Sequence, residues 1–491
     1  MKRTISVFLL IAMLASVSCG SAGTADVTAD DTTVVQDSAE TTAAGDDRES
    51  VSDDLPARDF GGDKFTMLVR TERKYEFEAE EENGDLLNDA VYKRNLAVED
   101  RFNIEFENIL MDSVWGDQAT QFTNSLRSSI QAGEGAYDLV ASYAATIPAL
   151  VSQGLFANWS DMDYVDFSKP WWSEKVKDEM TINGKCFMIT GDISLALWEG
   201  MSCVMFNKKL ADNYGIGNMY DLVKEGNWTF DKMLDITKDR YQDLDGDGEV
   251  SDNDAFGMIH GTATEIDNYK EAFEIPVTKR GDDGYPEFAL KSEKIVDVLT
   301  RLDAWVWNSN DVYWGLNLDR PVLQEIFSRG NSLLFNSTLG ATQNLRDMKD
   351  DFGIIPYPKY DENQKDYHST SLDEFSMFVI PVDAPDTDKT AFITEALCAE
   401  SYKKVVPVFY DVVLKTKNAR DNDSAEMIDI IRDGLVFDWG YIYSVTMGQP
   451  GHQLAILLKA HNTNIASEFD KKAKTYEKNL EKALKVYRGE E

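Results

Sequence analysis

The sequence contains few of the residues that most catalytic and metal centres use. Its 491 residues include four histidines and four cysteines, and neither set has the spacing of a metal site. The GxSxG, HExxH, P-loop and GxGxxG motifs are missing, which argues against the hydrolase, zinc-protease and nucleotide-binding classes that they define. A glycosidase needs only two carboxylates, and 87 acidic residues always offer a suitable pair, so this class remains open.

Positive charge is also scarce. The chain has 49 Lys and Arg residues against 87 Asp and Glu residues, which gives a formal net charge of −38. So much negative charge repels phosphate backbones and anionic lipids, and we therefore expect no nucleic-acid partner. The sequence shows no strong basic cluster, so it offers no pocket for an anionic ligand. Solubility accounts for most of the acidic excess.

Three cysteines remain beyond the N-terminal segment, too few for a disulfide framework. Cys186 and Cys203 lie in apolar, strand-like runs, and Cys398 lies in a helical run. Free cysteine packs as a small buried hydrophobe, which is the first interpretation. A Cys186–Cys203 disulfide is the alternative if the two strands pair.

Long hydrophobic runs are confined to the N-terminus. Residues 1–18 read as a signal peptide: Lys2 and Arg3 precede an apolar core at 5–17 that is too short to span a bilayer. Cys19 follows at the cleavage point, which resembles a bacterial lipoprotein signal with a lipidated Cys19. Plain secretion is the alternative. Residues 19–58, rich in small and acidic residues, predict a disordered linker after the anchor.

The length predicts two lobes, and the first pattern along the chain is α/β. Strands and helices alternate at 64–70, 86–102, 104–106, 119–132, 137–141 and 146–153. This order is typical of a parallel sheet, in which a ligand lies beyond the carboxyl ends of the strands. Arg70 to Glu72 and Ser142-Tyr143 occupy those positions.

The stretch 183–215 predicts a crossing between lobes. Two strand-like runs, 185–189 and 202–207, flank a segment in which Trp198 and Glu199 stand side by side. A large aromatic ring beside a carboxylate is unusual in a segment that only joins two strands. We therefore expect this crossing to line a ligand cleft.

The segment DLDGDGEVSDND at 243–254 fits the twelve-residue calcium loop. Oxygen ligands at alternate positions can wrap a cation that needs six to eight of them. The predicted Ca²⁺ ligands are Asp243, Asp245, Asp247, Glu249 through its carbonyl, Ser251 and Asp254. Asp254 stands where Glu is commoner. A single loop favours a structural ion over a sensor, and a solvated acidic turn is the alternative.

The order of these parts resembles the extracellular solute-binding proteins of ABC importers, the family that includes maltodextrin-binding proteins. A lipoprotein start carries the resemblance together with NDAVYKRN (88–95), VEDRFNI (98–104), YDLV (137–140), NGK (183–185), MFNKKL (205–210), FGIIPYPK (352–359) and FSMFVIP (375–381). The resemblance covers most of residues 60–490. Its specificity lies in the order and spacing of the segments.

The resemblance implies a two-lobed, periplasmic-binding-protein-like α/β fold whose discontinuous lobes are joined by hinge crossings. Lobe one would comprise residues 59–190 and 336–400, and lobe two residues 191–335 and 401–491. The crossings would lie at 189–193, at 335–337 and after Ala399.

The resemblance also places candidate ligand contacts. Residues that follow strands, flank crossings or supply aromatic platforms in such proteins correspond here to Tyr143, Asp192, Trp198, Glu199, Asn336, Ser337, Glu374, Trp439 and Tyr441. A neutral sugar would suit them, because its C–H faces stack on aromatic rings and its hydroxyls need fixed donors and acceptors.

The implied function is non-enzymatic. A lipid-anchored monomer at the extracellular face of the membrane would bind a solute, in first place a sugar or oligosaccharide, and deliver it to ABC permease subunits. Two alternatives stay open. One is a secreted polysaccharide-acting hydrolase, and the other is a calcium-dependent surface adhesin.

Overall fold

The computed structural model describes residues 48–315, 318–418 and 420–490. The predicted signal peptide, Cys19 and the linker up to residue 47 lie outside the described residues. Within the described part of the chain, no helix is long and apolar enough to cross a membrane.

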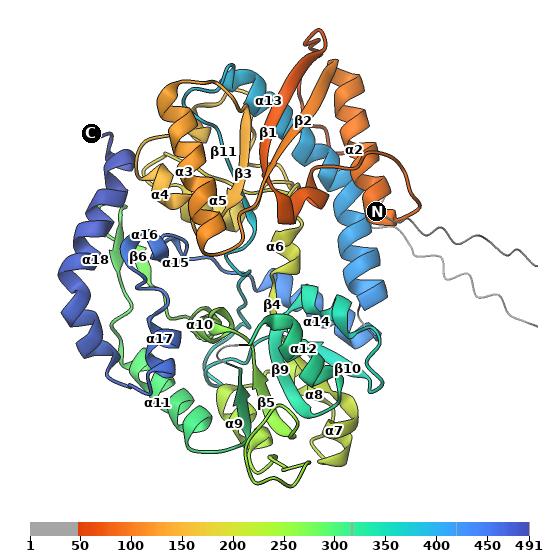
Figure 1. Cartoon of the computed structure of the whole chain (residues 1–491), viewed down its shortest axis with the longest axis vertical. Helices are drawn as coiled ribbons and strands as arrows, with labels where there is room; N and C mark the ends of the chain where they lie inside the picture. The colour runs from red at the N-terminus through yellow and green to blue at the C-terminus, as the bar shows by residue number, and fades with distance from the viewer. Residues whose placement is uncertain (1–47, 316–317, 419, 491) are drawn as a thin grey trace, which may run out of the picture. The chain divides into compact units, whose positions relative to one another are not determined.

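The first sheet has the strand order β11-β3-β1-β2 (Figure 1). Its strands are β1 (Asp63–Arg70), β2 (Ile104–Met111), β3 (Leu139–Tyr143) and β11 (Ser376–Val379). β1 pairs in parallel with β2 and β3, whereas β11 runs antiparallel to β3. The helices that enclose this core include α2 (Leu86–Phe102), α3 (Asp117–Ala132) and α13 (Thr387–Glu400). The predicted α/β lobe is therefore present.

The second sheet has the order β10-β4-β9-β5-β8. Its strands are β4 (Ser202–Asn207), β5 (Phe256–His260), β8 (Val312–Trp314), β9 (Ser332–Thr338) and β10 (Phe352–Ile355). All of β4 is buried, and its side chains alternate: Val204 and Phe206 enter one core cluster, while Cys203 and Met205 enter another. Helices thus cover both faces of this sheet, which explains why the sequence of β4 is almost continuously apolar.

The remaining elements surround the two sheets and connect them. They are η1 (Thr71–Glu76), α4 (Pro148–Val151), η2 (Trp159–Asp161), α5 (Glu174–Met180), α6 (Ala196–Glu199), α7 (Lys208–Asn213), α8 (Met219–Lys224), α9 (Phe230–Thr237), α10 (Ala263–Ala272), β6 (Thr278–Arg280), β7 (Pro286–Phe288), α11 (Glu293–Trp307), α12 (Arg320–Ser328), η3 (Leu339–Leu345), the π-helical η4 (Ser401–Val405) and η5 (Pro407–Asn418), α14 (Asn422–Asp433), α15 (Trp439–Ile442), α16 (Ser444–Met447), α17 (Gln453–Lys459) and α18 (Ile465–Arg488).

Two segments cross side by side between the sheets. The first begins after Ile189, which bridges Phe378 of the first sheet, and ends at β4 of the second. The second runs back from residue 369 to β11, and the two are joined where Leu372 N donates to Gly200 O at 2.9 Å and Ser202 N donates to Thr370 O at 2.9 Å. The predicted crossing at 189–193 is thus the beginning of a longer one that contains α6 (Figure 1).

The predicted crossing at 335–337 is wrong. β9 continues through these residues to Thr338 and pairs with β4 and β5 along its length. β10 also pairs with β4, so residues 352–355 belong to the second sheet, although the predicted lobe one included them. A buried apolar strand has the same pattern in either sheet, and only its partner decides its place. After Ala399 the chain enters a core cluster that holds Val91 of α2 as well as Phe335 of β9, so Val405 and Phe409 pack between elements of both lobes.

The predicted assignment of 401–491 to lobe two alone is also wrong. Helix α18 has 24 residues and is about 36 Å long, which is enough to reach both cores. Its first residue, Ile465, packs in the core of the second sheet, whereas Leu480, Leu484 and Tyr487 pack in the core of the first. An amphipathic stripe predicts the buried face of such a helix but not which core covers it.

The end of the predicted linker is packed rather than disordered. Asp53 is buried and forms an ion pair with Arg101, in which Arg101 Nη2 donates to Asp53 Oδ1 at 3.0 Å. Val51 and Leu55 pack against the first core. The predicted strand at 185–189 forms only isolated bridges. Cys186 and Cys203 are free and lie in different clusters, so the disulfide alternative is wrong.

Candidate ligand-binding cleft

A cavity of about 650 Å³ lies between the two sheets. Arg70 ends β1, Tyr143 ends β3, and Thr262 follows β5 after a two-residue step. These residues meet because the carboxyl ends of parallel strands and the helix starts that follow them point into the same crevice. Its volume is within the usual range for a small-molecule site.

Five side chains of alternating charge form a row, and the middle three, Arg73, Glu374 and Arg320, line this cavity. From one end to the other they are Glu199, Arg73, Glu374, Arg320 and Glu265. Arg320 Nη1 donates to Glu374 Oε1 at 2.6 Å and Arg320 Nε donates to Glu265 Oε1 at 2.8 Å. Arg73 reaches Glu374 Oε2 at 3.5 Å and Glu199 Oε2 at 3.4 Å. The row joins η1 on the first sheet, both crossings, and α12 and α10 on the second sheet.

The two arginines stabilise the central carboxylate of the row. Burial acts to raise the pKa of Glu374, but Arg320 and Arg73 lower it below its usual value. Burial raises the pKa of Glu199, against a hydrogen bond from the Tyr75 hydroxyl at 2.6 Å. A carboxylate between two guanidinium groups is therefore the centre of the row.

One wall of the cavity is aromatic and apolar. Tyr143 is buried, with its ring 6.2 Å from that of Trp115 in an edge-on arrangement and the Arg70 guanidinium 5.1 Å from its own centroid. Trp115 is 54% exposed and Val114 is 55% exposed, although both line the cavity. A large ring left exposed inside a cleft offers a flat surface for an apolar ligand face.

The opposite wall carries a titratable pair. His452 lines the cavity, and its Nδ1 lies 2.9 Å from Asp267 Oδ2. Burial lowers the pKa of His452, but the hydrogen bond and charge of Asp267 raise it above its usual value overall. Asp373 also lines the cavity, and burial raises its pKa to about 6.

The structure brings three of the nine predicted contacts to the cleft. Tyr143 lines the main cavity, Glu374 lines it and an adjoining smaller one, and Glu199 lines the smaller one. Tyr441 stands one layer behind, with its ring 5.2 Å from that of His452.

The other five predicted contacts lie elsewhere. Trp439 is buried and stacked on Tyr443 at 3.9 Å, and Trp198 packs on Tyr410 at 5.6 Å. Asn336 and Ser337 are buried within β9, where Gly261 N donates to Asn336 Oδ1 at 2.6 Å. Asp192 is buried at the start of the crossing, and burial raises its pKa well above the usual value. None of these five residues lines either of the two cavities.

The predicted site residues omit most of the charged ones. Arg70 and Glu72 carried a signal, because they follow the first strand. Arg73, Arg320 and His452 had none, since they come from a short 3₁₀ helix, the start of α12 and the loop before α17. The conclusion that no basic cluster exists is also wrong. Arg70 from β1, Arg73 from η1 and Arg320 from α12 line this cavity together, and acidic side chains pair with them.

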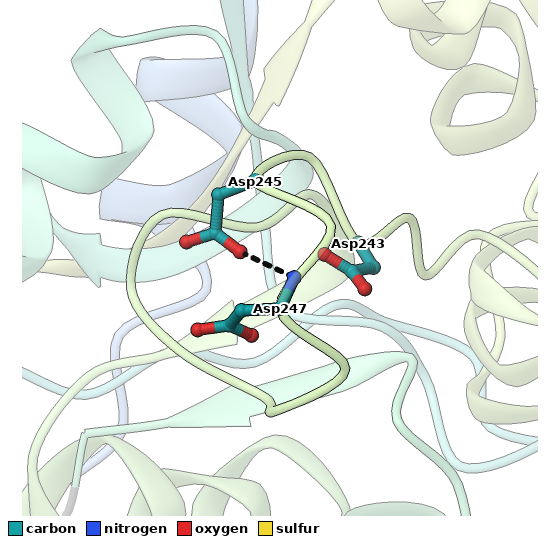
Figure 2. A group of neighbouring side chains, drawn as sticks. All are labelled: Asp243, Asp245 and Asp247. Atoms are coloured by element: carbon teal, nitrogen blue, oxygen red, sulfur yellow. Dashed lines mark hydrogen bonds between the residues drawn. The ribbon is translucent and has the colours of Figure 1, made fainter.

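The predicted calcium loop folds around its carboxylates (Figure 2). One carboxylate oxygen each from Asp243, Asp245 and Asp247 lies within 4.8 Å of the others, and all three residues are exposed. Gly248 N donates to Asp243 Oδ2 at 3.0 Å, and Asp247 N donates to Asp245 Oδ1 at 3.2 Å. Asp254 is buried instead, and its carboxylate accepts from Leu244 N, Ser251 N and the Tyr241 hydroxyl. Asp254 thus holds the loop closed from inside.

Comparison with known proteins assigns the family. The model of the bacterial extracellular solute-binding protein family matches residues 112–422, more than half of the chain, and the chain belongs to that family. No curated protein matches the sequence.

Solved structures share the two-lobed fold at low sequence identity. The galacto-N-biose-/lacto-N-biose I-binding protein of an ABC transporter from Bifidobacterium longum, in complex with lacto-N-biose, is 12% identical with a TM-score of 0.56 and covers 87% of this chain and 98% of its own. A cyclo/maltodextrin-binding protein complexed with maltotetraose is 15% identical with a TM-score of 0.54, and the match covers 87% of this chain and 97% of that protein. An ABC substrate-binding protein from Listeria monocytogenes in complex with cycloalternan is 14% identical with a TM-score of 0.52, and the match covers 88% of this chain and 100% of that protein.

Proposed function

We propose that this protein is the substrate-binding component of an ABC uptake transporter. As a monomer it binds a neutral sugar or oligosaccharide in the cleft between its lobes and passes it to membrane permease subunits without chemical change. The observation that carries the proposal is the cavity itself, which combines the exposed Trp115 ring with a row of charged donors and acceptors. The family and the sugars bound by the similar structures support it.

The walls match the two kinds of surface on a sugar. The C–H face of a pyranose ring is apolar and stacks on an aromatic ring such as Trp115. Each hydroxyl both donates and accepts, so it can bond to Arg320 and to Glu374 without leaving either charge unpaired. A strongly charged ligand would leave one of the two without its partner, which costs free energy in a buried site.

Binding without turnover distinguishes this function from that of a hydrolase. Glu374 is held between two arginines, so it is a poor proton donor or nucleophile. A thermal-shift screen of the chain from residue 20 onward against lacto-N-biose, maltotetraose, cycloalternan, monosaccharides and dipeptides tests the proposal. A sugar at 100 times its Kd should raise the free energy of unfolding by about 2.7 kcal/mol. Failure of every sugar to shift the transition, or the appearance of cleaved sugar, would contradict it.

We further propose that Cys19 carries the lipid anchor, which holds the protein at the extracellular face of the cell membrane. The family is extracellular, which supports this location, and the sequence around Cys19 supports the anchor. Replacing Cys19 by Ser should move the protein from the membrane fraction to the soluble fraction. Equal membrane association of the variant would contradict lipidation.

We also propose that the 243–254 loop binds Ca²⁺ as a structural ion. The support is the cluster of three exposed carboxylates on a backbone already bent around them. Chelation with EDTA should lower the melting temperature, and calcium should restore it. Asp245→Ala should abolish the response, whereas Asp252→Ala, in the same loop but outside the predicted ligands, should keep it. Identical melting curves with and without EDTA would refute the site.

A further inference from the structure

A second, smaller cavity adjoins the main one. Its volume is about 240 Å³, against about 650 Å³ for the main cavity. Arg73, Glu374 and Arg320 line both cavities, so these three side chains form a partition between them. We propose that the smaller cavity is a second ligand compartment, which takes one further polar ring of a neutral, hydroxyl-bearing chain whose other rings occupy the main cavity. This inference rests on the proposed function and specifies the length of its ligand.

The partition is held by side chains and not by backbone. Glu374 is its centre, with Arg320 at 2.6 Å on one carboxylate oxygen and Arg73 at 3.5 Å on the other. Their side chains are 31%, 26% and 18% exposed, respectively, so open space borders them. Long side chains can swing while the two sheets stay in place. A ligand can therefore pass this partition by exchanging hydrogen bonds with it.

The two compartments differ in chemistry. Exposed apolar and aromatic residues, among them Trp115 and Ile456, line the main cavity. The smaller one is lined by the amides of Gln324, Gln343 and Asn344, together with the Thr338 hydroxyl and Glu199. Amides and hydroxyls both donate and accept, so this lining suits a ring that presents hydroxyls rather than an apolar face.

The fold keeps the smaller compartment open. Its floor is formed where α6 meets η3 and the second crossing, and glycines stand at both contacts. A Cβ at Gly200 would lie 2.5 Å from Ser371 Oγ, and one at Gly340 would lie 3.3 Å from Glu199 O. Asn344 Nδ2 donates to Gln324 Oε1 at 2.6 Å, which ties η3 to α12 across the compartment. The walls are thus fixed independently of the partition.

The alternating charges select a neutral ligand. A hydroxyl placed beside Glu374 can donate to the carboxylate and accept from Arg320 or Arg73, which replaces part of the row without stranding a charge. An ammonium group would compete with both arginines, and a carboxylate would compete with Glu374. The partition therefore passes hydroxyl-bearing units and rejects charged ones.

The test is a length series. Linear α-1,4- and β-1,4-linked gluco-oligosaccharides of one to six units are titrated calorimetrically into the wild-type chain, Asn344→Trp and Gln343→Trp. Both variants place a large ring in the smaller compartment at exposed positions, and Gln343→Trp does so while keeping the Asn344–Gln324 hydrogen bond. Thermal unfolding verifies that both variants fold. Asn363→Trp, at an exposed position in a different surface pocket, is the matched control.

The wild-type protein should gain about tenfold in affinity at the one added unit that enters the smaller compartment. The two compartment variants should lose this gain and bind shorter chains within twofold of wild type, while Asn363→Trp should match wild type at every length. Variants that match wild type throughout, or that weaken all lengths equally, would overturn the second compartment and leave the proposed function intact. A wild-type protein that binds none of these sugars, lacto-N-biose or maltotetraose would overturn both.

Discussion

At the scale of single residues, the cleft is lined by side chains that do not belong to the hydrophobic cores. Trp115 is the clearest case, because it is more than half exposed and yet lines the cavity beside Tyr143. Glu374 and its two arginines are similar: they are polar, partly exposed and joined to one another. Such residues can change with the ligand while the cores stay the same.

Replacing Trp115 by Ala should therefore weaken sugar binding without loss of stability. Removing the stacking surface should cost about 1.4 kcal/mol, a tenfold increase in Kd by calorimetry. Trp307→Ala is the matched control, since Trp307 is 40% exposed and lies outside both cavities. Unchanged affinity in Trp115→Ala would show that this ring is not part of the site.

Glu395 links stability to pH. Burial raises its pKa to about 7, against hydrogen bonds from Trp171 and Trp172 Nε1 at 2.9 and 2.8 Å. Since the folded pKa of Glu395 lies above its unfolded value, its contribution to the free energy of unfolding is fully present below about pH 4.5. This contribution is lost as the pH rises through about 7. Urea unfolding from pH 5 to pH 8 should show a smaller loss for Glu395→Gln, which mimics the protonated acid. Equal slopes for the two proteins would contradict this.

At the scale of elements, local signals predicted helices better than they predicted crossings. The helix at 86–102 begins and ends as predicted, with the Asp85 carboxylate accepting from two backbone N–H groups of its first turn. Thr229 caps α9, where its hydroxyl accepts a hydrogen bond from Lys232 N. The crossings depend instead on isolated bridges such as Ile189 to Phe378, between residues far apart in the sequence. No local pattern records such a pair, and the same holds for Arg73 and Arg320, which meet only through Glu374.

The first crossing should be sensitive to added volume at Gly191. A Cβ there would lie 2.7 Å from Trp171 O and 3.1 Å from Cys398 Sγ. Because a backbone atom cannot move freely, Gly191→Ala should lower the free energy of unfolding by about 1–3 kcal/mol. Urea denaturation measures this change. A variant as stable as wild type would show that the crossing can shift to accommodate the methyl group.

At the scale of the whole molecule, net charge opposes folding. A formal charge of −38 makes the folded chain repel itself, because folding brings like charges closer together. Raising the ionic strength from 0.01 to 0.15 M shortens the screening length from about 30 to about 8 Å. The melting temperature should therefore rise by about 2 °C in calcium-free NaCl. A fall would mean that the surface ion pairs outweigh the repulsion.

The two-lobed α/β plan could be predicted at this scale, because alternation of strands and helices and the order of segments survive at low identity. The membership of each lobe could not. β10 and α18 are apolar or amphipathic segments that either core could cover, and only tertiary packing assigns them. Only three of the nine predicted contacts line the cavities, because sequence can indicate the crevice but not the direction in which each side chain points.

The most direct test of the account is a crystal structure of the chain with the sugar that gives the largest thermal shift. The account predicts a sugar ring stacked on Trp115 and hydroxyls bonded to Glu374 and Arg320 in the cavity between the sheets. A sugar bound elsewhere on the chain, or in this cavity without contact to Trp115 and Glu374, would contradict it.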